Sequence, residues 1–166
     1  RELIEDLWGL SCGNLRKHLE GGGGVVLLDY ADPRPEVRIV VSIAAPPEAV
    51  FRALIEPEAI QKWFGTESAT VEPRVGGRYD LSWRYQVDGK DVHGGPTTIL
   101  ELVPNRRLAL NWPDWRGDTS VTGQSISFSL EPEGKGTRLT FVHTGFGRTT
   151  DIGDYPFGWA GFLAGL

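Results

Sequence analysis

The chain has 166 residues and a formal net charge of −5; 40% of its residues are hydrophobic and 23% are charged. This balance is typical of a globular protein with one domain and a short additional segment. It disfavours nucleic acid and an anionic membrane as partners, because binding to phosphates requires clustered Lys and Arg. The single cysteine, Cys12, excludes an internal disulfide and agrees with a cytoplasmic location.

The sequence also lacks the features of an exported or membrane-spanning chain. It has no apolar run of the roughly 18 residues that a membrane span requires, and no charged segment followed by an apolar leader. It begins at Arg1 and contains no methionine. We therefore expect a fragment of a longer product.

The first predicted elements are a strand and a broken helix. Arg38–Ile43 is rich in β-branched residues, which favour a strand. Pro46 and Pro47 start a helix, and its apolar face comprises Val50, Phe51, Leu54 and Ile55. Pro57 ends this helix, and a further helical turn leads to Trp63.

Val75–Arg78 forms a predicted turn that contains two glycines. After this turn, the sequence has the pattern of an antiparallel sheet. In the first run, apolar residues alternate with polar ones at Tyr79, Leu81, Trp83, Tyr85 and Val87. Further runs follow at Thr97–Val103, Leu108–Trp112, Ser120–Leu130 and Thr137–Thr144. Their regular spacing favours a meander, and a final helix is predicted from Tyr155-Pro156 onward. The fold class is therefore α+β: a curved antiparallel sheet wrapped around a C-terminal helix, with an extra N-terminal helix.

Several short motifs resemble one known family. In chain order they are Ala45-Pro46-Pro47-Glu48-Ala49-Val50-Phe51, Trp63-Phe64, Val75-Gly76-Gly77-Arg78-Tyr79, Glu101-Leu102-Val103-Pro104-Asn105-Arg106-Arg107-Leu108, Gly136-Thr137, His143-Thr144-Gly145-Phe146 and Gly158-Trp159. Together they resemble the Hsp90 ATPase-activator homologues, a branch of the START-like (helix-grip, SRPBCC) superfamily. The resemblance implies a helix-grip domain over residues 25–166.

Three functions are compatible with this resemblance, since one fold hosts many activities. The first is non-enzymatic binding of a small hydrophobic molecule. The second is that of a co-chaperone in the stress response, which stimulates a chaperone ATPase through a surface contact. The third is a cyclase or hydrolase activity. We favour the first, because a strongly curved sheet around one helix often leaves an apolar space that aromatic side chains line.

The candidate ligand-binding residues share the predicted inner faces of the strands and helices. They are Trp63, Tyr79, Trp83, Tyr85, Trp112, Phe128, Phe141, His143 and Trp159. For most of them, filling of the core is the alternative interpretation. Trp112 is expected at the rim, because it ends its strand beside Trp115.

Few residues could perform catalysis. His143 is the candidate acid or base, with Tyr85 or Glu101 in support, although a structural histidine is the simpler interpretation. His93 is expected in a loop or at the start of a strand. Glu101 alternates with Leu100 and Leu102, which are expected to point inward, so it should lie on the outer face as a solvated carboxylate or in a strand ion pair. Neither His93 nor His143 has a metal-ligand neighbour at a familiar spacing, so no metal and no cofactor are expected.

The first 24 residues are predicted to form an amphipathic helix and a glycine-rich linker. One apolar stripe comprises Ile4, Trp8, Cys12, Leu15 and Leu19, and such a stripe requires burial. This segment resembles the end of the family's long terminal helix. It is either the remnant of a preceding tandem domain or an element that packs on this domain or on a second copy, as in a homodimer with exchanged helices.

Overall fold

The computed structural model describes residues 27–28, 36–87, 90–93, 96–113, 122–146, 152–153 and 155–166. The strands are β1 (Leu27–Leu28), β2 (Val37–Ile43), β3 (Ser68–Val71), β4 (Tyr79–Val87), β5 (Lys90–His93), β6 (Ile99–Val103), β7 (Arg107–Asn111), β8 (Ser125–Glu133) and β9 (Gly136–Thr144). The helices are α2 (Pro47–Ile55), α3 (Pro57–Phe64) and α4 (Tyr155–Leu163). The predicted N-terminal helix and linker, residues 1–24, lie outside the described residues.

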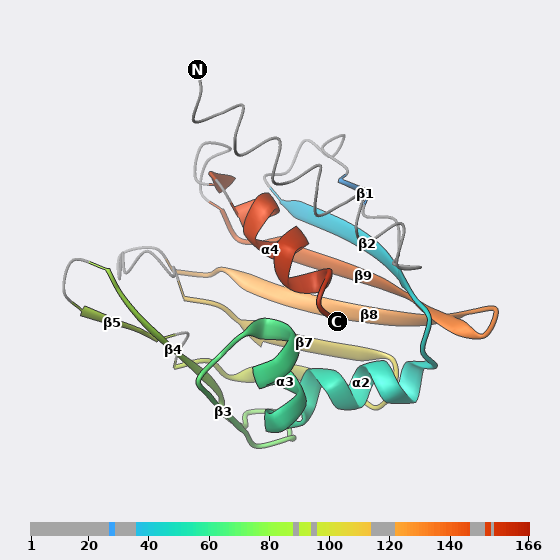
Figure 1. The fold of residues 1–166 in the computed structure, drawn as a ribbon, viewed down its shortest axis with the longest axis horizontal. Coiled ribbons are helices and arrows are strands. Elements are labelled where there is room, and N and C mark those ends of the chain that lie inside the picture. Colours follow the sequence, from blue (N-terminus) through green and yellow to red (C-terminus); the bar gives the residue numbers. More distant parts are fainter. Residues whose placement is uncertain are drawn as a thin grey trace.

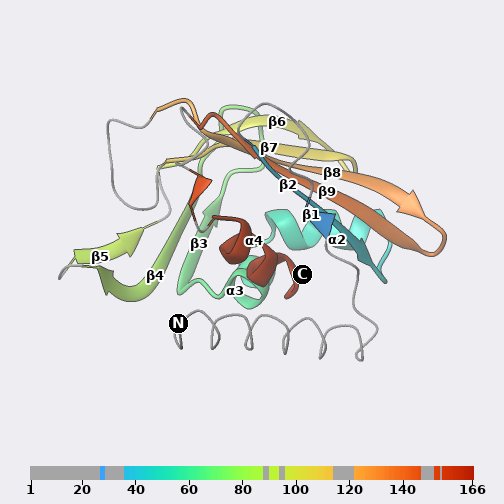
Figure 2. The same ribbon diagram turned by 90° about the horizontal axis from the view of Figure 1, so that it is seen from above.

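The strands form an antiparallel framework, as predicted. A six-stranded sheet has the order β1-β2-β9-β8-β7-β6, in which β6 to β9 form the expected meander (Figures 1 and 2). β2 returns beside β9, with Val37 opposite His143. A three-stranded sheet has the order β3-β4-β5. The short strands β3 and β5 were not predicted, and β5 places His93 at its last position rather than in a loop or at a strand start.

The two sheets meet at the predicted turn before β4. Gly76 has a φ of 77°, a backbone conformation that glycine adopts without strain. At Gly77, an added Cβ would lie 2.1 Å from the carbonyl oxygen of Glu72. Backbone hydrogen bonds of 2.8 Å then join Gly76 N to Ile99 O and Ile99 N to Gly77 O. The sheets are therefore continuous at this corner, and β3 to β5 turn toward the side that carries the helices (Figure 2).

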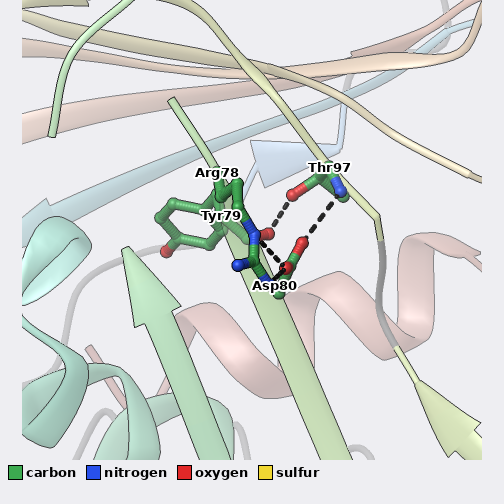
Figure 3. Close-up of polar contacts among 4 residues, drawn as sticks. All are labelled: Arg78, Tyr79, Asp80 and Thr97. Carbon is green, nitrogen blue, oxygen red and sulfur yellow. Dashed lines mark hydrogen bonds and ion pairs between the residues drawn. The ribbon is translucent and has the colours of Figure 1, made fainter. Parts of the chain in front are cut away.

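Side chains strengthen this corner (Figure 3). The carboxylate of Asp80 accepts a hydrogen bond of 2.9 Å from Arg78 Nε and one of 3.3 Å from the backbone N–H of Thr97. The Thr97 hydroxyl donates to the Tyr79 carbonyl. Consequently the start of β4 is fixed to the segment that leads into β6.

The helices α2 and α3 close one end of the sheet. Pro57 begins α3 and has no N–H, so the carbonyl of Ala53, four residues earlier, has no helical donor. The Trp63 indole Nε1 donates to that carbonyl at 2.9 Å. In the same last turn of α2, the Leu54 carbonyl accepts a hydrogen bond of 2.8 Å from the Tyr79 hydroxyl. Burial raises the pKa of Tyr79, which favours this protonated donor.

The helix α4 crosses the same face of the sheet and packs on β2 and α3 (Figures 1 and 2). Tyr155, Trp159 and Leu163 recur every four residues and are buried. Every residue of α4 apart from Tyr155 is apolar, including Phe157, whose side chain is 60% exposed. The C-terminal helix within the curved sheet confirms the predicted α+β class.

Candidate functional site

An aromatic cluster occupies the layer between the sheet and the helices. It comprises Trp63, Phe64, Trp83, Trp112, Phe128, Phe141, Trp159 and Phe162. Trp159 lies at its centre, with ring centroids 4.4 Å from Phe141, 5.3 Å from Trp112 and 5.6 Å from Phe64. Such separations are typical of favourable aromatic pairs.

Period-two alternation explains how the strands supply this layer. Ile126, Phe128 and Leu130 of β8 are buried, as are Phe141 and His143 of β9, while the residues between them are more exposed. Tyr79 and Leu81 of β4 follow the same rule. The predicted inner faces are confirmed for these residues.

The cluster reaches the surface beside Phe64. Trp83 and Phe162 are only partly buried, and their rings lie 5.5 and 4.3 Å from that of Phe64. Trp112, which was expected at the rim, is only 7% exposed because Phe64 and Trp159 pack against it. The accessible aromatic surface is therefore formed by β4 and α4, and not by the end of β7.

The other candidate residues lie at different places. Tyr79 is buried at the α2–α3 end, where its hydroxyl is bonded to Leu54. The side chain of Tyr85 and residue Trp115 lie outside the described part of the chain. Phe64 and Phe162 were missed as site residues, although the Trp63-Phe64 pair had been noted in the sequence.

A polar series of side chains runs through the same layer. The Trp159 indole Nε1 donates to His143 Nδ1 at 3.1 Å. His143 Nδ1 is therefore an acceptor, and in the neutral ring the proton is on Nε2. Nε2 lies 2.8 Å from Gln124 Oε1, so it donates to that oxygen. This sequence of donors also fixes the orientation of the Gln124 amide.

The series ends in a buried donor that is not used. Gln124 is 3% exposed, and within the described part of the chain its Nε2 has no hydrogen-bond partner. Thr66 Oγ1 is the other such buried side-chain atom among the described residues. Buried polar groups normally have partners, so these two atoms require an explanation.

The backbone around Gln124 is closely constrained. Gly145 has a φ of 90°, and a Cβ there would lie 2.2 Å from the Gly123 carbonyl oxygen. The carbonyl of Gln124 accepts a hydrogen bond of 2.9 Å from the Trp112 N–H. The start of β8 is therefore held against both the end of β7 and the segment after β9.

Two of the residues considered for catalysis, His143 and Glu101, have hydrogen-bond or ion-pair partners in the fold. Both ring nitrogens of His143 are engaged, by Trp159 and by Gln124. Glu101 forms an ion pair with Arg107 at 2.6 Å, as expected, although the predicted alternation is wrong at Leu100, which is 51% exposed because a bulge shifts the register between Ile99 and Glu101. Among the described residues, no three His, Cys, Asp or Glu side chains come together as metal ligands.

Comparison with known proteins identifies the family of this chain. The family model described as Activator of Hsp90 ATPase homolog 1-like protein matches residues 44–166. No curated protein matches the chain. In the described part of the chain, none of the helices has the length and hydrophobicity needed to span a membrane.

The solved structures similar to this chain include the following three. Protein CV1439 from Chromobacterium violaceum shares 28% sequence identity with this chain and has a TM-score of 0.62; the match covers 79% of this chain and 93% of CV1439. Protein MLL2253 from Mesorhizobium loti is 26% identical with a TM-score of 0.61, over 77% of this chain and 90% of its own. The Aha1 dimer from Colwellia psychrerythraea is 25% identical with a TM-score of 0.61, over the same shares of 77% and 90%.

Proposed function

We propose that this chain, which belongs to the Activator of Hsp90 ATPase homolog 1-like family, binds a small hydrophobic molecule between its sheet and α4. The proposal rests on one combination of features: the aromatic cluster reaches the surface at Trp83 and Phe162, and the same layer contains a buried amide donor that has no partner among the described residues. A core with only a structural role requires neither feature. A ligand site typically combines apolar walls with a few polar groups that orient the ligand.

A surface role as a co-chaperone is the second candidate, and the family description supports it. The large hydrophobic side chains exposed in the described residues are Val75, Leu100, Val103 and Phe157. They belong to the turn before β4, to β6 and to α4. Single exposed apolar residues are ordinary on protein surfaces, so they favour no docking site.

The experiment is a titration of the folded chain with Nile red, a neutral dye whose fluorescence rises in apolar surroundings. We expect binding that hydrophobic molecules reverse by competition. Trp83→Ala should weaken dye affinity by several-fold; because this ring packs against the core, its loss also lowers stability, and the titration is made under conditions where a urea melt shows the variant folded. Leu100→Ala, at an exposed position outside the cluster, is the matched control and should bind like the parent.

Two outcomes would contradict the proposal. One is a folded chain that binds no apolar probe, in which case the aromatic cluster is a filled core. The other is equal dye affinity in Trp83→Ala and the parent. Native mass spectrometry of the gently purified protein adds an independent test, since a co-purified apolar molecule would support the proposal directly.

A further inference from the structure

The side-chain amide of Gln124 lies in the layer where the ligand is proposed to bind, and its position indicates which class of ligand it could recognise. Gln124 lies two, four and six residues before Ile126, Phe128 and Leu130, which are all buried on the inner face of β8. Alternate residues of an extended chain share one face, so Gln124 belongs to the same face. Its partner His143 lies on the inner face of β9 and contacts Trp159 of α4. The Gln124 side chain therefore lies in the layer between the sheet and α4, where the ligand is proposed to bind.

The direction of the amide follows from the hydrogen bonds beside it. If Nε2 instead of Oε1 faced His143, it would require an acceptor at His143 Nε2, and Nδ1 would then carry the proton. The Trp159 indole N–H already points at Nδ1, so that arrangement would set two donors against each other. Oε1 consequently faces His143, and the two N–H bonds of Nε2 are the ones that no described residue accepts.

The surroundings select the chemistry of what these N–H groups can bind. An amide NH₂ only donates, so its partner must be an acceptor. Among the described residues no Lys or Arg is buried, so none of them would compensate the charge of an anion in this layer. The rings of Phe146 and Tyr155 pack against His143 and add to the apolar surroundings. A neutral oxygen on an otherwise apolar molecule fits these conditions best.

We propose that Gln124 is a specificity-determining residue that donates a hydrogen bond to a carbonyl oxygen of a small apolar ligand, with Trp159 and His143 as positioning residues that hold its amide in the donating orientation. The inference rests on the proposed function, and it names the class of molecule: a hydrophobic ketone, ester or similar neutral carbonyl compound. A ligand without an acceptor would leave the buried N–H groups unpaired, which is costly.

The test compares two probes of nearly equal shape, acetophenone and α-methylstyrene, which differ by C=O in place of C=CH₂. Dissociation constants are measured by NMR titration of the full chain. We expect acetophenone to bind about fivefold to tenfold more tightly, the usual gain from one buried hydrogen bond. The Gln124 side-chain amide resonances of the parent should shift with acetophenone and remain unchanged with α-methylstyrene.

Gln124→Met, which keeps the length of the side chain and removes the donor, should bind the two probes equally. Gln61→Met is the matched control, because Gln61 lies on α3, where its amide donates to the Glu67 carbonyl at 3.1 Å. It should keep the preference of the parent. If Gln124→Met does not fold, the Gln124 amide resonances of the parent decide the question.

The outcomes separate the two proposals. If the parent binds both probes equally and its Gln124 amide signals do not respond, the amide holds only a buried water; this inference is then wrong while the proposed function stands. A preference for acetophenone that persists in Gln124→Met would also overturn it. If neither probe binds to the folded parent, both proposals are wrong.

Discussion

At both ends of the helix-bearing face, ring side chains of buried residues donate hydrogen bonds, but the acceptors differ. At the α2–α3 junction, the Trp63 indole and the Tyr79 hydroxyl donate to the backbone carbonyls of Ala53 and Leu54. At the α4 end, the Trp159 indole donates to the side chain of His143, which donates to Gln124. The first set ends on helix carbonyls that would otherwise lack partners, whereas the second ends on an amide whose donors are unused within the residues that the structure describes.

The difference shows how a structural role can be separated from a binding role for similar aromatic residues. A donor that satisfies a carbonyl at a helix end completes the backbone hydrogen bonding, and nothing further is required there. A series that ends in an unpaired buried donor has a cost that a ligand or a water must offset. The α2–α3 end should therefore determine stability, and the α4 end should determine binding.

The largest effect is expected for Trp63→Ala. Trp63 is 8% exposed, packs on Phe64 and Phe128, and supplies the missing donor for Ala53. Its removal should lower the free energy of unfolding by about 3–5 kcal/mol, measured by urea titration. Phe157→Ala, at a 60% exposed position, is the control and should change little. Equal midpoints for Trp63→Ala and the parent would remove the basis of the comparison.

Gly145→Ala should lower the free energy of unfolding by about 2–4 kcal/mol and also weaken probe binding. Two causes combine: the left-handed backbone costs roughly 1–2 kcal/mol for alanine, and the added methyl group collides with the Gly123 carbonyl. Gly123→Ala is the matched control, because its φ of 86° is similar and a Cβ there would meet no atom within 4 Å. Thermal melts of both variants measure the contribution of the collision. If the two variants melt together, the close contact behind Gln124 has no energetic role.

Deletion of residues 1–24 tests whether the α4 end requires a further layer. The predicted stripe of that segment must be buried, on this domain or on a second copy, and each large apolar side chain it buries is worth roughly 1.5–3 kcal/mol. We expect the deletion to lower the free energy of unfolding by about 2 kcal/mol or to change the oligomeric mass. Urea titration and analytical ultracentrifugation measure these two quantities. An unchanged value of both would make the segment a loose appendage.

Tyr79→Phe should have the smallest effect, a loss of about 0.5–1.5 kcal/mol at pH 7 from the hydrogen bond to Leu54. Burial raises the pKa of Tyr79 above its usual value of about 10, so the folded state binds this proton more tightly than the unfolded state. The resulting stability is complete below about pH 10 and is lost as the pH rises further. Unfolding measured from about pH 9 to 11 should therefore decline less steeply in Tyr79→Phe. Parallel declines would show that Tyr79 ionises freely in the fold.

Much of the fold follows from local patterns in the sequence. The prolines at 46, 47 and 57 fix where α2 begins and where α3 starts, and the alternation in β8 and β9 predicts which side chains face inward. β3 was missed because Ser68–Val71 is four residues long and mixes exposed with partly buried positions. The exposure of Trp112 was misjudged because it depends on Phe64 and Trp159, which are distant in sequence.

The part of the candidate site that carries the further inference was not predicted. Gln124 lies within the predicted strand run Ser120–Leu130, where a polar residue after a glycine gives no sign of burial. Its even spacing from Ile126 and Phe128 was the available signal. The role of its amide depends on the hydrogen-bond direction through Trp159 and His143, which only their arrangement in space determines.

The edges of the six-stranded sheet determine whether sheets of two molecules can pair with each other. At one border the described part of β1 is Leu27–Leu28, and at the other the start of β6 already exchanges backbone hydrogen bonds with Gly76 and Gly77. Beyond Ile99, β6 has a bulge and then Glu101, whose charge discourages a neighbouring strand. A bulged and charged border opposes the joining of sheets from different molecules. This design favours solubility at high concentration, and it makes pairing of β6 strands an unfavourable route to a dimer.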